Sequence, residues 1–313
     1  MKNVLNIKTI LLSLLIGAVA AAGIYVGLII YIVPIFMAYC FAAFGPVCFG
    51  VSVAAALGSI TALAGVESAL YHALLFVPSA VILSFVLSGK CSYRTAVASC
   101  AFALAVGLYL NMFVPSFLKG LSVADAADAY IGEAVSIYST SIQGVEEEVA
   151  QAVNEMVDMM KMYSLEITFA NIVMTAMLFG FLQVVIAYAL FRKKLNGLHK
   201  MAEFRKWELS NSFMWGCVTM LAAACIINAT GVTYGGAVLM TVLFIVLLPL
   251  CVTGLSCTEF FIQIIPEGKG FRRVITYGLA IMCMPYCIFM FAIEGLADKL
   301  FKLRRRIVII KRD

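Results

Sequence analysis

The chain has few charged residues and almost no histidine, and these shortages exclude several classes of protein. Charged residues make up 12% of its 313 residues and hydrophobic residues 64%, whereas soluble domains carry about a quarter of charged residues. Its two histidines, His72 and His199, are too few for a zinc site of ordinary composition. The composition therefore predicts a membrane-embedded protein without a bound metal.

The short motifs of the common enzyme classes are missing as well. The sequence has no Walker A loop, no nucleophile elbow, no histidine pair on a helix with a glutamate between, and no Cys-x-x-Cys. Its ten cysteines lie in or beside apolar runs, where free, buried thiols are expected and a disulfide framework is not. The net charge of +5 comes from basic residues in short connections and in the tail, so it does not indicate nucleic acid as a partner. We therefore expect a protein that is not an enzyme and needs no cofactor.

The sequence consists mainly of long apolar runs. Nine occur, at residues 9–31, 32–44, 46–64, 68–88, 94–117, 165–191, 212–229, 236–263 and 274–297. Most approach the ~20 residues that a helix needs to cross a hydrocarbon layer of ~30 Å. No run alternates as a barrel strand does, and backbone groups in lipid must be satisfied internally. The sequence predicts an all-α fold, a polytopic transmembrane helical bundle.

One long polar segment interrupts these runs between Leu118 and Glu166. It holds nine of the seventeen acidic residues against two lysines, which gives it a local charge of −7. Ser122 and Asp125 are spaced as at a helix start, and apolar residues recur at helical spacing after Ser122 and again after Gly144. An outer pair of amphipathic helices is predicted, either as a spacer packed on the membrane domain or as a cap that gates a ligand cavity.

Charge predicts how the chain is divided and oriented. Residues 1–117 form a first transmembrane helical block, residues 118–164 an extracytoplasmic acidic helical insertion, residues 165–297 a second transmembrane block and residues 298–313 a basic cytoplasmic tail. Lysine and arginine mark the cytoplasmic side of a membrane protein, and they gather before the first run, at residues 90–94, in residues 192–211 and in the tail. Both termini are therefore predicted to be cytoplasmic, in a bacterial inner membrane.

The final run conflicts with this orientation, because nine simple crossings would leave the basic tail outside. Pro285 divides the run, and proline removes a backbone donor and kinks a helix. We predict that residues 274–297 enter the membrane and return as two half-length pieces, which leaves about eight crossings.

Ionisable and polar residues inside apolar runs are unfavourable in lipid, so they are candidates for a functional site. Glu67 and His72 fall near the outer start of the fourth run, where they either pair at the boundary between bundle and cap or bind a substrate. Asn111 is the third candidate for substrate binding, with the alternative that its amide joins two helices. Glu259 and Gln263 share a helix face in the eighth run, close enough to its end to reach the interface.

Both tryptophans lie at the connection before the seventh run. Trp207 and Trp215 flank Asn211, beside several basic residues. An interfacial anchor at the lipid headgroups explains this pattern. Contact with a cytosolic or membrane partner is the alternative.

Two short motifs stand out in the last third of the chain. The first comprises Phe204, Arg205, Trp207 and Leu209 leading into Trp215 and Gly216, and the second comprises Gly295, Leu296, Asp298, Phe301, Leu303 and Arg304. Together with the order of apolar runs, basic turn and outer insertion, these motifs resemble the YybS-like membrane proteins of Gram-positive bacteria. The fold of that family looks like that of the substrate-binding subunits of energy-coupling-factor vitamin transporters.

This resemblance implies a helical bundle with an outward-facing solute pocket, docked through small residues of its first helix on a transmembrane coupling subunit with an ATPase module. Ala18 and Ala22 are then the candidate docking pair, and the pocket lies beneath the acidic insertion. The leading hypothesis is a solute-binding component of a transporter in the lipid bilayer. The alternative is a non-enzymatic envelope scaffold or regulatory protein that recruits partners through its outer helices and basic inner loop.

Overall fold

A computed structural model of the chain describes residues 7–141, 147–191, 195, 203–232, 234–264, 268–282, 284–304 and 306. The chain divides into two compact units, Met1–Lys200 (unit 1) and Met201–Asp313 (unit 2). Five basic residues used to predict the orientation, Lys2, Arg192, Lys193, Lys194 and Lys200, lie outside the described residues, as do Arg305 and the tail beyond residue 306. Over the described ranges the regular elements are helices and there is no strand, which confirms the all-α prediction.

The helices follow the apolar runs closely. Unit 1 contains α1 (Ile7–Tyr25), α2 (Gly27–Ile30), α3 (Val33–Phe44), α4 (Pro46–Leu87), α5 (Tyr93–Leu118), α6 (Val123–Ser141), α7 (Glu147–Met162) and α8 (Ser164–Phe191). Unit 2 contains the short 3₁₀ helix η1 (Phe204–Lys206), α9 (Asn211–Ala229), α10 (Gly235–Ile264), α11 (Lys269–Met282) and α12 (Met284–Phe301).

Six of the described helical segments are long and apolar enough to cross a membrane. They are Gly27–Phe44, α4, α5, α8, α9 and α10, and a shorter apolar helix covers Thr9–Tyr25. The first apolar run, predicted to continue to residue 31, is interrupted earlier, at Val26. This residue has non-helical backbone angles (φ −122°, ψ 87°) and ends α1. Since α4 folds back on itself, these segments agree with the about eight crossings expected from hydropathy.

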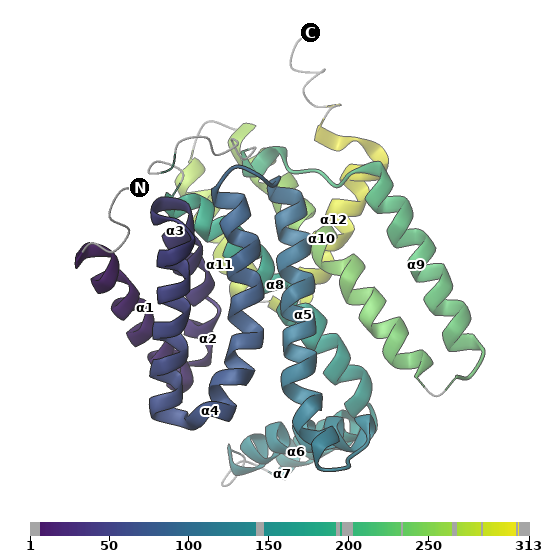
Figure 1. Ribbon diagram of the computed structural model, residues 1–313. Coiled ribbons are helices and arrows are strands. Elements are labelled where there is room, and N and C mark those ends of the chain that lie inside the picture. Colours follow the sequence, from purple (N-terminus) through teal and green to yellow (C-terminus); the bar gives the residue numbers. More distant parts are fainter. Residues whose placement is uncertain are drawn as a thin grey trace. The chain divides into compact units, whose positions relative to one another are not determined.

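The fold-back of α4 occurs at Gly65. This glycine has a φ of 86°, in the region that side chains disfavour, and it separates two helical arms. The ring of Phe41 in α3 lies near those of both Phe49 and Phe85, with centroids 5.9 and 6.5 Å apart. In a straight helix Phe49 and Phe85 would be about 54 Å apart at 1.5 Å per residue. The two arms therefore run antiparallel (Figure 1).

Small residues bring helices of unit 1 into backbone contact. A Cβ added to Gly107 of α5 would lie 2.6 Å from the carbonyl oxygen of Leu74, and one added to Gly180 of α8 would lie 2.6 Å from the amide nitrogen of Ala101. Such close approaches allow helices to associate in lipid. Because α8 follows the acidic segment and packs on α5, which precedes it, unit 1 contains helices from both sides of that segment.

The acidic segment forms the two predicted amphipathic helices, α6 and α7. A reciprocal capping box starts α6: the Ser122 amide donates to Asp125 Oδ2 (3.0 Å) and the Asp125 amide donates to Ser122 Oγ (3.2 Å). The shared apolar core of the helix pair comprises Ile131, Val135, Val153, Val157, Met160 and Ile167, the last from α8. Figure 1 shows α6 and α7 lying across the ends of α5 and α8.

The capping box makes the start of α6 sensitive to acid. Hydrogen bonds from the Ser122 hydroxyl and amide lower the pKa of Asp125 below its ordinary value, so the cap is intact at neutral pH and is lost as the pH falls through that lowered pKa. We expect an NMR titration of the Asp125 carboxyl to give a midpoint below about 3.9. In the Ser122→Ala variant the midpoint should return toward the ordinary value, and an unchanged midpoint would contradict the capping role.

Unit 2 is built on the packing of α12 against α10. A Cβ added to Gly254 would overlap the carbonyl group of Phe291, and one added to Gly295 would overlap the carbonyl oxygen of Leu250. The two backbones therefore touch. Helix α11 ends at Met282 and α12 begins at Met284; the residue between them, where a break near Pro285 is predicted, lies outside the described residues.

Described residues beyond 297, such as Asp298, pack closely on the rest of unit 2. Helix α12 continues to Phe301, and Arg304 is only 5% exposed. Residues 298–304 therefore belong to the packed part of unit 2, because an ion pair described below holds them there.

Candidate functional sites

Glu67 and His72 lie on the second arm of α4, just after the fold-back at Gly65. Glu67 is exposed and accepts a hydrogen bond from the Tyr71 hydroxyl (3.1 Å). Nδ1 of the half-buried His72 lies 2.7 Å from the carbonyl oxygen of Ser68. These hydrogen bonds stay within one helix, so they do not join the two candidate residues to each other.

Asn111 is brought to the same end of unit 1. Gly107 of α5 packs on Leu74, and Asn111 lies one helical turn further toward the end of α5 at which α6 begins. The structure thus places Glu67, His72 and Asn111 at the end of the bundle that carries α6 and α7. No hydrogen bond among these three residues is present in the described part of the chain.

Polar contacts attach the helix pair to the bundle. The Ser164 hydroxyl at the start of α8 donates to Asp128 Oδ1 of α6. About two turns further along α8, the side-chain amide of Asn171 donates to the hydroxyl of Tyr130 (3.0 Å). Together with the apolar core, these contacts hold α6 on α8.

Ala18 and Ala22 lie on the exposed face of α1, at the spacing expected for a docking pair. The opposite face is buried, where Ile16, Ala20 and Gly23 pack inward. Exposed leucines extend the outer face and comprise Leu11, Leu14 and Leu15. This face is available to lipid or to another helix.

The two tryptophans have different surroundings. Trp215 on α9 is 71% exposed, as a headgroup anchor requires. Trp207 is half-buried, with its ring in edge contact with Phe204 at a centroid distance of 5.3 Å. The carbonyl group of Trp207 also belongs to a polar network that hydropathy alone does not reveal.

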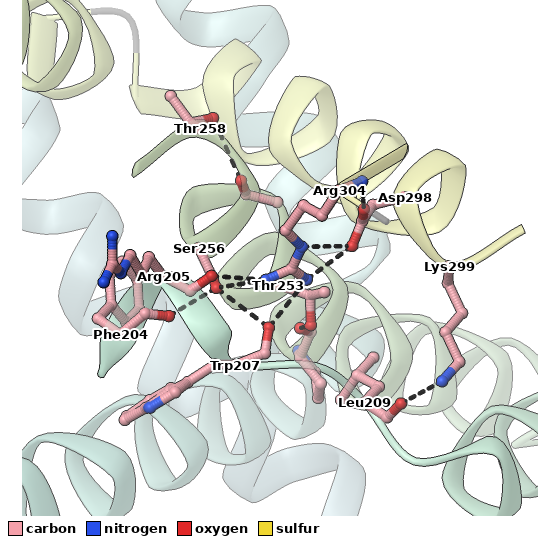
Figure 2. A network of polar contacts seen from close by, with 12 residues as sticks. Phe204, Arg205, Trp207, Leu209, Thr253, Ser256, Thr258, Asp298, Lys299 and Arg304 are labelled. Atoms are coloured by element: carbon pink, nitrogen blue, oxygen red, sulfur yellow. Dashed lines mark hydrogen bonds and ion pairs between the residues drawn. The ribbon is translucent and has the colours of Figure 1, made fainter. Parts of the chain in front are cut away.

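Arg304 is the centre of this network. Its Nε and Nη2 donate to Asp298 Oδ2 (2.9 and 2.6 Å), and its amide donates to Asp298 Oδ1 (3.2 Å). Nη1 donates to the carbonyl oxygen of Arg205 (2.9 Å) and to Ser256 Oγ (3.1 Å), and Nη2 donates to the carbonyl oxygen of Trp207 (3.0 Å), as Figure 2 shows. The ion pair is 5% and 6% exposed. It fastens the end of α12 to α10 and to the connection before α9.

Two further contacts support the same connection. The Ser256 hydroxyl lies 2.6 Å from the carbonyl oxygen of Phe204 and 3.0 Å from that of Trp207. Nζ of Lys299 donates to the carbonyl oxygen of Leu209 (Figure 2). The two motifs singled out in the sequence therefore meet in space. The presence of both motifs is the sequence signal that could have indicated this network.

Glu259 forms a second polar cluster in unit 2. Its carboxylate accepts from Arg273 Nη2 and Nε, the latter at 3.2 Å, and from the Tyr277 hydroxyl at 3.0 Å. Gln263 also donates to it, at 2.5 Å. The sequence indicates that Glu259 and Gln263 share a helix face, and the structure adds a partner from α11, Arg273. The cluster fastens α11 to α10.

These observations define an all-α, multi-pass membrane protein. Residues 9–299 match the family described as predicted membrane protein (DUF2232), and the chain belongs to that family. No curated protein and no solved structure matches the chain. Among the described residues, no group of three or more histidine, cysteine, aspartate or glutamate side chains is placed to hold a metal ion.

Proposed function

We propose that unit 1 is the solute-binding part of a membrane transporter, similar to the substrate-binding subunits of energy-coupling-factor transporters and to the YybS-like proteins. The observation that supports this most is the architecture of the unit. Six apolar helical segments, which are α1, α2 with α3, the two arms of α4, α5 and α8, carry an amphipathic helix pair across one end. A solute bound beneath that pair would be shielded by α6 and α7.

Glu67, His72 and Asn111 are the proposed polar contacts for the solute. All three lie at the end of the bundle that α6 and α7 cross. Polar groups at this position are unfavourable in lipid and are explained by a ligand or an aqueous cavity. The exposed pair Ala18 and Ala22 on α1 would dock on a coupling subunit, which would in turn bind an ATPase module.

Native mass spectrometry of the gently extracted protein tests this proposal. We expect the wild-type protein to retain a small solute, and we expect Asn111→Leu and His72→Ala to lose it. Asn228→Leu, which changes an exposed amide in unit 2, is the matched control and should keep the solute. A wild-type protein that retains no solute, or variants that retain it equally, would contradict the proposal.

A scaffold or regulatory role is the second candidate, favoured by the exposed carboxylates Glu155 and Asp158 on α7. Such a surface could recruit envelope proteins without binding a solute. Co-purification of envelope-assembly proteins in place of a coupling subunit, lost when residues 122–163 are replaced, would favour this role. Retention of a solute together with an ATPase module would favour the transporter.

A further inference from the structure

A polar pocket lies in unit 2 beside the start of α9. Its volume is about 140 Å³, and its lining residues are Glu208, Asn211, Thr253, Asp298, Lys299, Lys302 and Arg304. Three of these side chains are cations and two are carboxylates. The pocket belongs to a different unit from the proposed solute site, so a ligand of this pocket is independent of the proposed solute.

The buried ion pair contributes shape to the pocket but no net charge. Asp298 accepts three hydrogen bonds from Arg304 through both of its oxygens. The five N–H groups of the Arg304 guanidinium are used by Asp298, Ser256 and two backbone carbonyl groups. Because its oxygens already accept these bonds, Asp298 is a poor ligand for a metal cation.

The charge of the pocket then depends on two lysines against one glutamate. Nζ of Lys299 donates to the carbonyl oxygen of Leu209, and an ammonium has three donors. Lys302 is exposed. The hydroxyl of Thr253 and the amide of Asn211 add neutral polar groups. The net charge of +1 favours an anion that accepts several hydrogen bonds.

The backbone at Lys302 supports a role for this lysine beyond helix termination. Its φ is 55°, in the left-handed region, and it is the one non-glycine residue in the described ranges with a positive φ. It follows the end of α12, a position at which glycine is usual. A lysine there is disfavoured by its backbone conformation, whereas its charge can contribute to the pocket that it lines.

The position along α9 indicates where such an anion comes from. Helix α9 is long and apolar enough to cross a membrane, and it begins at Asn211, which lines the pocket. Trp215, exposed one turn further on, is typical of the headgroup region. In a bilayer crossed by α9, the phospholipid phosphates would therefore lie close to this pocket.

We propose that this pocket binds a negatively charged phosphate group, supplied by an anionic phospholipid headgroup or by a soluble phosphate, with Lys299 and Lys302 as its main contacts. The Asp298–Arg304 pair holds the pocket wall in place. The side-chain amide of Asn211 can donate a further hydrogen bond to a phosphate oxygen, whereas the hydroxyl of the buried Thr253 donates to the carbonyl oxygen of Pro249 (2.9 Å) and only lines the pocket.

Two binding measurements on the detergent-extracted full chain test the site and its source. Native mass spectrometry compares phosphatidylglycerol with phosphatidylcholine of the same acyl chains, and calorimetry titrates inorganic phosphate. The variants are Lys302→Gln, Lys299→Gln and Lys302→Gly, and the matched control is Arg306→Gln, an exposed basic residue that does not line the pocket. We expect each lysine variant to weaken binding about fivefold, since a cation near the membrane surface contributes about 1 kcal/mol.

The two measurements distinguish a phospholipid phosphate from a soluble phosphate. Preference for phosphatidylglycerol, reduced in the lysine variants and kept in Arg306→Gln, supports a lipid phosphate. Heat of phosphate binding that is lost in Lys302→Gln supports a soluble phosphate. Lys302→Gly should raise the melting temperature while weakening binding, which distinguishes a lost ligand contact from a damaged fold. Absence of binding in both measurements, or equal binding by all variants, would overturn the proposal.

Discussion

Replacing Arg304 by alanine is expected to destabilise unit 2 by about 3–5 kcal/mol, because removing one partner of a buried ion pair leaves the other charge uncompensated. Asp298 is 6% exposed and would lose two of its three hydrogen bonds from residue 304, keeping only the one from the backbone amide. The carbonyl groups of Arg205 and Trp207 would also lose the hydrogen bonds that Arg304 donates, although the Ser256 hydroxyl stays within 3.0 Å of the Trp207 oxygen. Equilibrium unfolding in mixed detergent, followed by tryptophan fluorescence, measures the change.

A second ion pair in the same unit is the matched control. Glu203 pairs with Arg205 at 2.7 Å, but these side chains are 58% and 37% exposed. Arg205, followed by Lys206, lowers the pKa of Glu203, yet solvent screens the pair, so Glu203→Gln should change stability little. Replacing Asp298 and Arg304 together by leucine and methionine should be less damaging than Arg304→Ala alone. Equal losses in the single and double variants would contradict the assigned role of the charge.

Adding a methyl group at Gly254 should be the second most damaging change, with a loss of about 3 kcal/mol from overpacking. The new Cβ would overlap the carbonyl group of Phe291 in α12. Because the obstacle is backbone, no side-chain rotation relieves the overlap, and α12 must move away from α10. Gly295→Ala meets the carbonyl oxygen of Leu250 in the same way and should be similar.

The control for these substitutions is a helical glycine with open space around it. A Cβ added to Gly216 in α9 meets nothing within 4 Å. Gly216→Ala should therefore be neutral or stabilising by up to about 1 kcal/mol, the helix propensity difference. Thermal denaturation of the three variants in one detergent compares them directly. A loss at Gly216 as large as that at Gly254 would refute the backbone contact.

The helices of this protein can be predicted from the sequence because their causes are local. Hydrophobic length determines the membrane-length helices, and the Ser122–Asp125 spacing predicts the start of α6. These features were predicted in type, with boundaries that differ by a few residues, as at Val26.

The polar network could not be predicted in the same way, because its acceptors are backbone carbonyl groups. Arg304 donates to the carbonyl oxygens of residues 205 and 207, about a hundred positions earlier in the chain. Residue type does not reveal such acceptors, since every residue has a carbonyl group. The fold-back at Gly65, by contrast, agrees with the sequence, because the runs at residues 46–64 and 68–88 were expected to cross the membrane one after the other.

That fold-back has a consequence for how the protein is made. The chain has no lysine or arginine between Lys8 and Lys90, so the turn at Gly65 gives the translocon no positive charge with which to orient either arm. The arms of α4 therefore enter the bilayer as a pair, and their direction is inherited from charges at distant points on the nascent chain.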